Sequence, residues 1–337
     1  MRRRTFLSRT MTAAAAAAVS ALPLPAIGAT VLKFSHTDQP NGTRDEAAKM
    51  FAKKVGEYTQ GRYDVKVYPA GQLANDPKAI EQLQLGGVDF TVSATGSYAT
   101  HIPSLNLTML PFLFDNYEQG WKFYDESKWL KAQYAKAPEK GFHFLATWEA
   151  GFRNMTTKGP LNTPADAKGK KLRSFPNEMM RWTLDAMGFN VVILPLPEVF
   201  LAIQQGVVWG QENPIDTIYA NKFYEVAPYV TLTQHVYSPI PLTISEKTWQ
   251  KLSPQDREAV TRAGREVETW IRNEIRANDD RQLKEMASKG AKISHPAIGP
   301  WREAVKSVYA KAKEKYGADA DAVVSDAEAV RKALPAK

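Results

Sequence analysis

The sequence predicts an α/β protein whose two lobes are connected by crossing segments and by a long helix. Short β-prone runs alternate with helical patterns from Val31 onward, as in sheets whose strands are separated by helical crossovers. Two turn-rich stretches, residues 151–160 and 238–241, are natural places for the chain to pass between lobes. A helical pattern in the last third of the chain is longer than one compact domain needs.

The first predicted elements form a β-α-β-α-β opening. Strands are expected over 31–35, 63–68 and 88–93, and helices over 42–57 and 76–84. The first helix repeats apolar residues at helical spacing, including Ala47, Phe51 and Val55, which gives it one face for packing on a sheet. Later strands are expected over 143–148, 171–174 and 190–194, with helices over 177–187 and 197–205.

The long helix begins at a clear start signal. Ser253 is suited to the N-cap, Pro254 to the first helical position and Asp256 to the first turn. Apolar residues keep helical spacing as far as Ile275, and an extension to about residue 289 would span about 54 Å at about 1.5 Å per residue. Two interpretations stay open, a single helix laid across two lobes or two ordinary helices with a break near residues 278–280.

The N-terminal residues 1–29 are predicted to be an export signal. Residues 2–9 are basic, residues 11–22 form an alanine-rich apolar run, and residues 26–29 offer small side chains for a signal peptidase. Within the basic part, the sequence RRTFL at 3–7 resembles the twin-arginine export signal, while an ordinary secretory leader remains the alternative. We therefore expect the mature chain in the periplasm. No later run approaches the length of a membrane-spanning segment.

The composition excludes several classes of protein. With 44% hydrophobic and 24% charged residues, the chain is expected to be globular. It has no cysteine, which excludes disulfides, thiolate zinc sites and cysteine nucleophiles. Four arginines of the export segment supply half of the formal net charge of +8, so the mature chain is not expected to bind nucleic acid.

The usual motifs of catalysis are missing from the sequence. It contains no nucleophile elbow, phosphate loop, zinc-protease motif or dinucleotide-binding fingerprint. The five histidines lack the spacing of metal ligands, so no metal site and no cofactor are expected. A pair of carboxylates that meet only in space, as in glycosidases, stays open.

Two arginines stand in positions that suit anion binding. Arg153 follows a predicted strand, and Arg173 lies within one, where a buried guanidinium needs a partner. Its fork of donors matches a carboxylate in two parallel hydrogen bonds, although an internal Asp or Glu could fill the same role. Asn213, followed by Pro214, fits a helix N-cap and equally an anion site at a helix start. The pattern alone does not choose between these roles.

Five sequence blocks resemble a known family. They are GFRNMT at 151–156, PADAKGKKLRS at 164–174, EVFLAIQQG at 198–206, GQENP at 210–214 and KFYEV at 222–226. In this order they look like the signature of substrate-binding proteins of tripartite ATP-independent periplasmic (TRAP) transporters, the DctP-like family. The resemblance extends over the mature chain and includes LPFLF at 110–114.

The resemblance implies a fold and a function. The fold would be the two-lobe periplasmic binding protein fold with a hinge and a long helix spanning both lobes. Lobe I would comprise residues 30–150 plus about 239–278, and lobe II residues 151–238 plus about 279–337. The protein, expected as a monomer, would capture a small organic acid and deliver it to the small and large TRAP membrane subunits. It would be neither an enzyme nor a cofactor protein.

The resemblance also implies ligand-binding residues. The main clamp for the ligand carboxylate falls on Arg173, with Arg153 and Asn213 beside it. The family commonly has Phe where this chain has Leu196 and Asp where it has Trp209, which puts the shape of the pocket in doubt.

Three further ligand contacts are expected from the order of the elements. Loops at the carboxyl ends of strands line the cleft in such sheets, which adds Thr37 and Ala94. Trp148 is a candidate apolar wall, with a role in the core as the alternative. Two other functions remain: an exported lyase or hydrolase acting on a small acid, and the binding protein of an ATP-driven importer.

Overall fold

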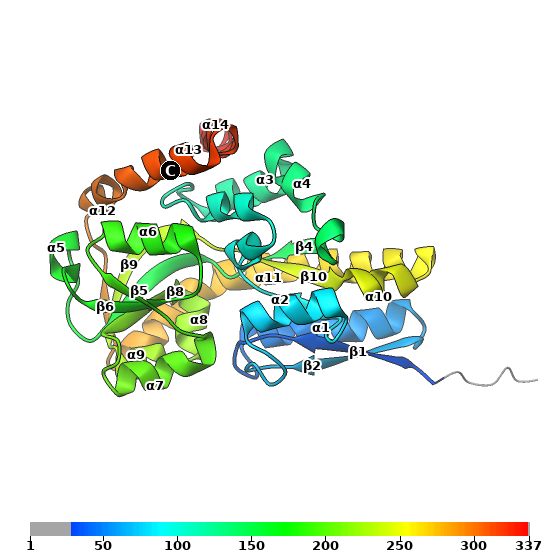
Figure 1. Cartoon of the computed structure of the whole chain (residues 1–337). Helices are drawn as coiled ribbons and strands as arrows, with labels where there is room; N and C mark the ends of the chain where they lie inside the picture. The colour runs from blue at the N-terminus through cyan, green and yellow to red at the C-terminus, as the bar shows by residue number, and fades with distance from the viewer. Residues whose placement is uncertain (1–27, 336–337) are drawn as a thin grey trace, which may run out of the picture.

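The computed structural model describes residues 28–335, so the export signal predicted over 1–29 lies almost wholly outside the described residues. The fold is α/β with two sheets, a five-stranded sheet of order β2-β1-β3-β10-β4 and a six-stranded sheet of order β11-β9-β5-β8-β6-β7. In Figure 1 the unit with β1 and β2 lies beside the unit with β6 and β8, and helix α11 runs behind both.

The first sheet combines the N-terminal strands with one that returns from late in the chain. Its strands are β1 (Thr30–Ser35), β2 (Tyr63–Tyr68), β3 (Phe90–Val92), β4 (Phe142–Trp148) and β10 (Ile240–Ser245), and its helices are α1 (Thr43–Tyr58), α2 (Asp76–Leu85) and α10 (Glu246–Lys251). β1 is parallel to β2 and β3, whereas β10 is antiparallel to β3 and β4. Phe34, Phe51, Phe90 and Trp148 pack ring against ring in its core. The predicted β-α-β-α-β opening is confirmed.

The second sheet carries the blocks of the family resemblance. Its strands are β5 (Phe152–Thr157), β6 (Lys171–Ser174), β7 (Asn190–Ile193), β8 (Gly210–Pro214), β9 (Tyr229–Tyr237) and β11 (Lys292–Ser294). The helical elements along it are α5 (Pro164–Ala167), α6 (Glu178–Ala186), η4 (Leu196–Glu198), α7 (Val199–Gln204), α8 (Ile215–Ala220) and α9 (Phe223–Val226). The carboxyl ends of the parallel strands β6 and β8 lie at one edge of this sheet.

The chain passes between the sheets twice. Residues 149–151 lead from β4 to β5, and residues 238–239 lead from β9 back to β10. The expectation of a turn-rich passage over 151–160 is wrong for residues 152–157, which form β5. Every residue of β5 is buried, including Arg153 and Thr156, because neighbouring elements cover both of its faces. Because many of its residues are polar, the sequence pattern did not indicate this central strand.

Helix α11 (Pro254–Ser288) is a single helix of 35 residues, which decides between the two interpretations of this segment. The backbone N–H of Asp256 donates to the Ser253 side chain at 3.1 Å, as expected for an N-cap. The helix packs on α1 and β4 of the first sheet and on α8 beside the second. Among the helices of residues 28–335, none is long and apolar enough to span a bilayer.

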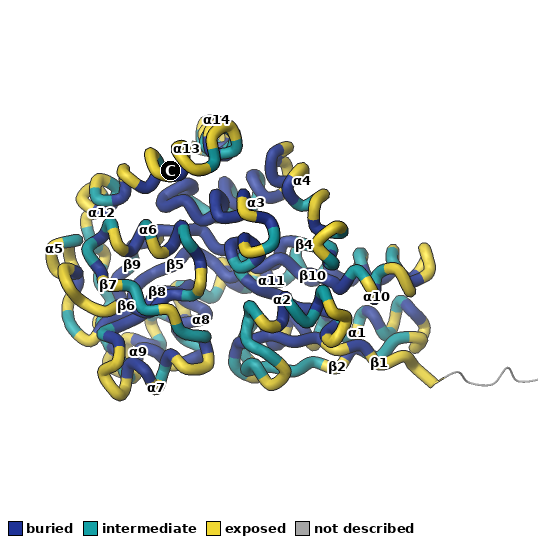
Figure 2. Tube along the Cα trace, viewed as in Figure 1, coloured by how far each residue is buried: buried dark blue, intermediate teal, exposed yellow. Residues whose placement is uncertain are grey.

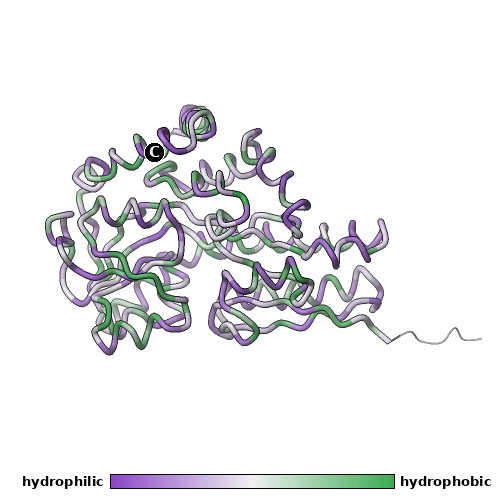
Figure 3. Tube along the Cα trace, in the orientation of Figure 1, coloured by the Kyte–Doolittle hydropathy of each residue, from purple (hydrophilic) through white to green (hydrophobic). Residues whose placement is uncertain are grey.

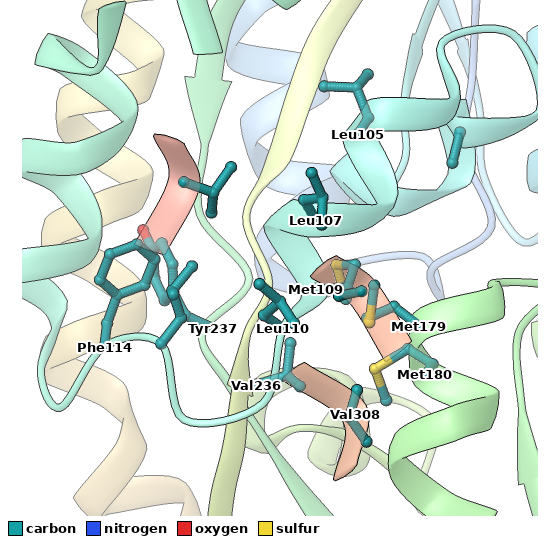
Figure 4. Close-up of a cluster of buried hydrophobic side chains, with 14 of the residues drawn as sticks. Leu105, Leu107, Met109, Leu110, Phe114, Met179, Met180, Val236, Tyr237 and Val308 are labelled. Atoms are coloured by element: carbon teal, nitrogen blue, oxygen red, sulfur yellow. The ribbon is translucent and has the colours of Figure 1, made fainter. Parts of the chain in front are cut away.

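Helices that the sequence did not predict cover one side of both sheets. They are η1 (Thr95–Thr100), η2 (Pro103–Met109), α3 (Tyr117–Glu126), α4 (Lys128–Tyr134) and η3 (Pro138–Lys140), with α12 (Ile298–Ala304), α13 (Lys306–Tyr316) and α14 (Ala318–Ala333) from the C-terminal part. In Figure 4, Leu107 and Met109 face Met179 and Met180 of α6, with Val308 of α13 below. A buried apolar cluster thus ties residues 98–137 to the second sheet.

The strands lie inside this covering. In Figure 2 the central strands are mostly buried, whereas the strands β2, β7 and β11 and the outer turns of the helices are partly exposed. Figure 3 shows the matching hydropathy, with apolar residues concentrated along the strands and polar residues along the outer helices. The sheets therefore form a rigid base on which side chains at the strand ends are held in place.

Candidate functional site

A cavity lies between the two sheets and encloses about 430 Å³ of space, part of which is continuous with solvent. Residues of both sheet units and of both crossing segments line it: Arg44, Asp76, Ala94, Ser97, Ala150, Arg153, Arg173, Phe175, Leu196, Asn213, Pro214, Ser238 and Ile240. A molecule held there would touch both halves of the protein.

Arg173 extends into this cavity from β6. Its residue is only 3% exposed, and its Nε donates to the backbone oxygen of Leu194 at 2.9 Å. Within residues 28–335, its two terminal nitrogens make no hydrogen bond, and no carboxylate forms a salt bridge with it. Burial lowers the pKa of Arg173 to about 10, although the nearby charge of Glu212 opposes the shift. The side chain remains a cation with two donors available to an anion.

Arg153, in contrast, is paired within the protein. Its Nη2 donates to Glu212 Oε1 at 3.0 Å, and its Nε also bonds to the same carboxylate. Ser174 donates to Glu212 Oε1 at 2.8 Å. Burial alone would raise the pKa of Glu212, but Arg153 and His235 outweigh it and hold the pKa at about 2. Both groups are thus charged, and their charges cancel. Arg153 lines the cavity, but the donors that it gives to Glu212 are not available to a ligand.

Asn213 does not cap a helix. It lies in β8, and the N-cap of α8 is Pro214, so the N-cap interpretation of Asn213 is wrong. The strand pairing of β5 with β8 turns its side chain toward Arg153, whose Nη2 donates to Asn213 Oδ1 at 3.1 Å. The amide of Asn213 also donates to Gln211 Oε1 and lines the cavity beside the arginines.

The other predicted ligand residues divide into two groups. Ala94 and Leu196 line the cavity, and Leu196 is 7% exposed. Trp148 does not: it is fully buried in the first core, and its Nε1 donates to the Gly264 oxygen at 3.0 Å. Thr37 also lies outside the lining, because its hydroxyl is turned onto Asp76 Oδ2 at 3.0 Å. Neither residue is among those that line this cavity, and a ligand contact by either stays a prediction.

Sequence reasoning missed Arg44, Asp76, Ser97, Phe175 and Ser238 as lining residues. Arg44 and Asp76 stand in the first turns of α1 and α2, the helices that follow β1 and β2. Helix starts after parallel strands open onto the cleft edge of a sheet, and this signal was present in the sequence. Phe175 packs under Arg153, with the guanidinium carbon 5.0 Å from the ring centroid.

Polar contacts hold the two halves together around the cavity. Asn221, which follows α8, donates to Asp38 Oδ1 at 3.0 Å. Thr43 of α1 donates to Asp216 Oδ1 of α8 at 2.6 Å. Asp38 and Thr43 belong to the first-sheet unit and their partners to the second, so these hydrogen bonds exist only when the units are close. In this structure the two units are therefore in direct contact beside the cavity.

The arrangement suits anion binding more than bond cleavage. The cavity presents the guanidinium groups of Arg173, Arg153 and Arg44 and the amide of Asn213, beside a single carboxylate, that of Asp76. No group of three or more metal-ligating side chains occurs in the part of the chain that the structure describes.

Sequence comparison places the chain among solute-binding proteins. Residues 34–315 match the model of a family described as bacterial extracellular solute-binding protein, family 7 (DctP). The chain is 30% identical over 308 residues to the sialic acid-binding periplasmic protein SiaP of Vibrio cholerae, which covers 91% of this chain and 94% of that protein.

Solved structures give the same result. The sugar acid binding protein of Advenella mimigardefordensis in complex with galactonate superposes with a TM-score of 0.87 at 30% identity, covering 90% of this chain and 99% of that one. A TRAP periplasmic solute-binding protein of Sulfurospirillum deleyianum with bound succinate superposes with a TM-score of 0.84 at 30% identity, covering 90% and 100%. Both confirm the two-sheet fold with its long helix.

Proposed function

Because the chain belongs to the bacterial extracellular solute-binding proteins of family 7 (DctP), we propose that it captures a small organic carboxylate in the cavity between its sheets. The family binds solutes and does not consist of enzymes, so the alternative of an exported lyase or hydrolase is set aside. Proteins of similar sequence and fold bind galactonate, sialic acid or succinate, all of which are carboxylates.

The observation that carries the proposal is the environment of Arg173. A buried guanidinium is costly unless an anion and hydrogen bonds satisfy it. Within residues 28–335 its terminal nitrogens lack such a partner, whereas Arg153 nearby has Glu212. We infer that the ligand carboxylate accepts two parallel hydrogen bonds from the guanidinium of Arg173. Arg153 and Asn213 would lie beside it. Ala94 and Leu196 would form apolar parts of the wall.

Capture would proceed by closure of two lobes. We propose that residues 30–150 with about 239–278 move against residues 151–238 with about 279–337, using the crossings at 149–151 and 238–239 as the hinge. A ligand shifts the balance between open and closed forms only through its higher affinity for the closed form. The cavity lining supports this step, because it draws on both units and so completes ligand contacts only on closure.

The family setting extends the proposal beyond the binding step. We propose that the sequence RRTFL at 3–7 directs export by the twin-arginine route and that the mature protein acts in the periplasm as a monomer. The loaded protein would then deliver its ligand to TRAP membrane subunits, the partners that the family implies. No cofactor enters this cycle.

Ligand screening and one pair of variants test the binding proposal. A thermal-shift screen of the mature chain against small organic acids should raise the melting temperature for its ligand, because binding to the folded state stabilises it. Calorimetry with that acid should show a loss of about 2–5 kcal/mol in Arg173→Lys and Arg173→Ala. Arg181→Lys, an exposed change on α6, is the control. Undiminished binding by both Arg173 variants would refute the proposal.

A further inference from the structure

Trp209 lies among lysines on the surface of the second-sheet unit. Its backbone N–H donates to the Lys171 oxygen at 2.8 Å, and its own backbone oxygen accepts from the Lys158 N–H at 3.0 Å. The Lys170 ammonium lies 5.5 Å from the centroid of the indole ring, and Lys168 belongs to the same loop as Lys170. We call this surface the outer basic patch: Lys158, Lys168, Lys170, Lys171 and Trp209.

The lysines of the outer basic patch are not neutralised by neighbouring acids. All four are exposed, and none forms a salt bridge within the part of the chain that the structure describes. The segments 158–171 and 206–209 hold four lysines and one acidic residue, Asp166, so their formal charge is +3. The carboxylate of Asp166 accepts from the backbone N–H groups of Asn162 and Thr163 at 2.9 Å. The fold therefore leaves an excess of positive charge at this surface.

Apolar side chains stand among these lysines. Trp209 is half-buried, and its ring packs on Gly159, where a Cβ would lie 3.3 Å from the ring. Val207, two residues before Trp209, is 48% exposed, and Leu201 of α7 is 55% exposed. An indole has an apolar body and a polar N–H, and tryptophan is enriched at the headgroup level of membranes. A half-buried tryptophan ringed by lysines suits that environment.

The outer basic patch lies away from the cavity between the sheets. In Figure 1, helix α5, which ends just before Lys168, lies at the outer edge of the second-sheet unit, on the side away from the first-sheet unit. None of the five residues of the patch lines the cavity. A partner bound at the patch would therefore leave the cavity lining uncovered.

We propose that the outer basic patch docks the protein on the anionic surface of a phospholipid bilayer. Each lysine near such a surface strengthens binding about fivefold. Trp209 would lie at the level of the headgroups, with its ring toward the acyl chains. The inference goes beyond the proposed function, because it does not depend on the solute that the cavity holds. Docking of this kind would keep the protein in the plane of the TRAP membrane subunits.

The composition of the patch favours a bilayer over an acidic protein surface. Protein interfaces are enriched in arginine and depleted in lysine, and the patch contains four lysines and no arginine. A lysine ammonium is a compact charge on a flexible stem, so it can follow lipid phosphates that have no fixed arrangement. An arginine fork would instead suit a partner whose carboxylates are held in place.

Vesicle binding by the mature chain tests the inference. The protein is sedimented with vesicles that contain equal parts of phosphatidylglycerol and phosphatidylcholine, and with vesicles of phosphatidylcholine alone. We expect binding to the anionic vesicles at low salt and its loss at about 1 M salt, where the Debye length is about 3 Å. Equal binding to both kinds of vesicle, or binding to neither, would overturn the inference.

Two double variants with the same loss of charge assign the binding to the patch. Lys158→Gln with Lys170→Gln should weaken binding to the anionic vesicles roughly 30-fold, about fivefold for each lysine. Lys128→Gln with Lys131→Gln, at exposed positions of α4, should leave that binding nearly unchanged. Equal weakening by the two double variants would mean that the net charge of the whole protein attracts the vesicles, which would overturn the inference.

Solute binding separates this inference from the proposed function. The variant Lys158→Gln with Lys170→Gln should bind the organic acid found in the thermal-shift screen with the affinity of the parent protein, because neither lysine lines the cavity. The same measurement shows that the variant is folded. Retention of the parent protein on immobilised polyglutamate without binding to anionic vesicles would assign the patch to an acidic protein surface and overturn the inference. Undiminished solute binding in the Arg173 variants would refute the proposed function alone.

Discussion

Arg153 and Glu212 form a buried ion pair that β5 and β8 bring together across 59 positions of sequence. Glu212 is fully buried, and besides Arg153 it accepts from Ser174. Such a pair contributes little net stability by itself, but removal of one partner leaves the other charge buried and uncompensated. The pair therefore has its main effect when it is broken.

Glu212→Gln should lower the free energy of unfolding by about 3–5 kcal/mol, the cost of an unpaired buried charge. Denaturant unfolding of the unliganded protein at pH 7 measures this. Glu303→Gln removes a carboxylate that is 70% exposed and should change stability by less than about 0.5 kcal/mol. Equal stabilities of Glu212→Gln and the parent protein would contradict the role given to this pair.

Replacement of Arg173, unlike that of Glu212, should weaken ligand binding without lowering the stability of the unliganded protein. Burial lowers its pKa to about 10, so at neutral pH its charged form is disfavoured in the folded state relative to the unfolded chain. Arg173→Gln removes that penalty, and the unliganded variant should be at least as stable as the parent while its ligand affinity falls by about 2–5 kcal/mol. Unfolding without ligand and calorimetry with ligand measure the two effects. A variant that binds normally, or that loses several kcal/mol of stability, would contradict this prediction.

Much of the fold was predictable because burial leaves a periodic record in the sequence. Strands β2 and β6 have the predicted bounds. Helix α1 differs from its predicted bounds by one residue at each end, and α2 by one residue at its C-terminal end. Strand β5 escaped prediction because its buried positions hold polar residues, which pair with neighbouring strands rather than with an apolar core. The hydrophobic pattern of a short segment does not indicate which strands, distant in sequence, pair with it.

The residue types of the candidate site could be predicted from the sequence, but which arginine forms an internal ion pair could not. Arg153 and Arg173 are equivalent by pattern, and only the register of β5 on β8 shows that Glu212 neutralises the first and not the second. Trp148 illustrates the converse. It is the last residue of strand β4, at the end nearer the cleft, yet its ring packs against Phe34 and Phe51. Packing of that kind is decided by the tertiary fold.

The contacts between the two units should control how long a ligand stays bound. Asn221 donates to Asp38 Oδ1 at 3.0 Å, a hydrogen bond that the proposed opening of the two lobes would break. Asn221→Ala removes this charge-assisted hydrogen bond, so the affinity for ligand should fall by about tenfold, mainly through faster dissociation. Stopped-flow measurement of dissociation gives the rate. Asn190→Ala, on exposed β7, should leave it unchanged, and an unaltered rate in Asn221→Ala would show that this contact does not stabilise closure.

Asp279 of α11 should make stability depend on pH. Burial raises its pKa to about 7; a hydrogen bond from Tyr117 opposes the shift, and Asp216, Glu149 and Asp280 add to it. The folded protein therefore keeps a proton that the unfolded chain releases above its ordinary pKa of 3.8. Unfolding then releases a proton between about pH 4 and 7, so this group's contribution to stability falls as the pH rises through that window.

Asp279→Asn removes this loss and keeps an acceptor for the Tyr117 hydroxyl, which lies 2.6 Å from Asp279 Oδ2. Relative to the parent protein, the variant should gain about 4 kcal/mol at pH 8 and much less at pH 4, where Asp279 of the folded parent protein is uncharged. Denaturant unfolding at the two pH values measures the difference, and every other titrating group cancels in it. Asp280→Asn, on the exposed side of the same turn, should show no such difference. A gain of equal size at both pH values would mean that Asp279 is not the group that titrates, because a neutral replacement can stabilise only where the carboxyl is charged.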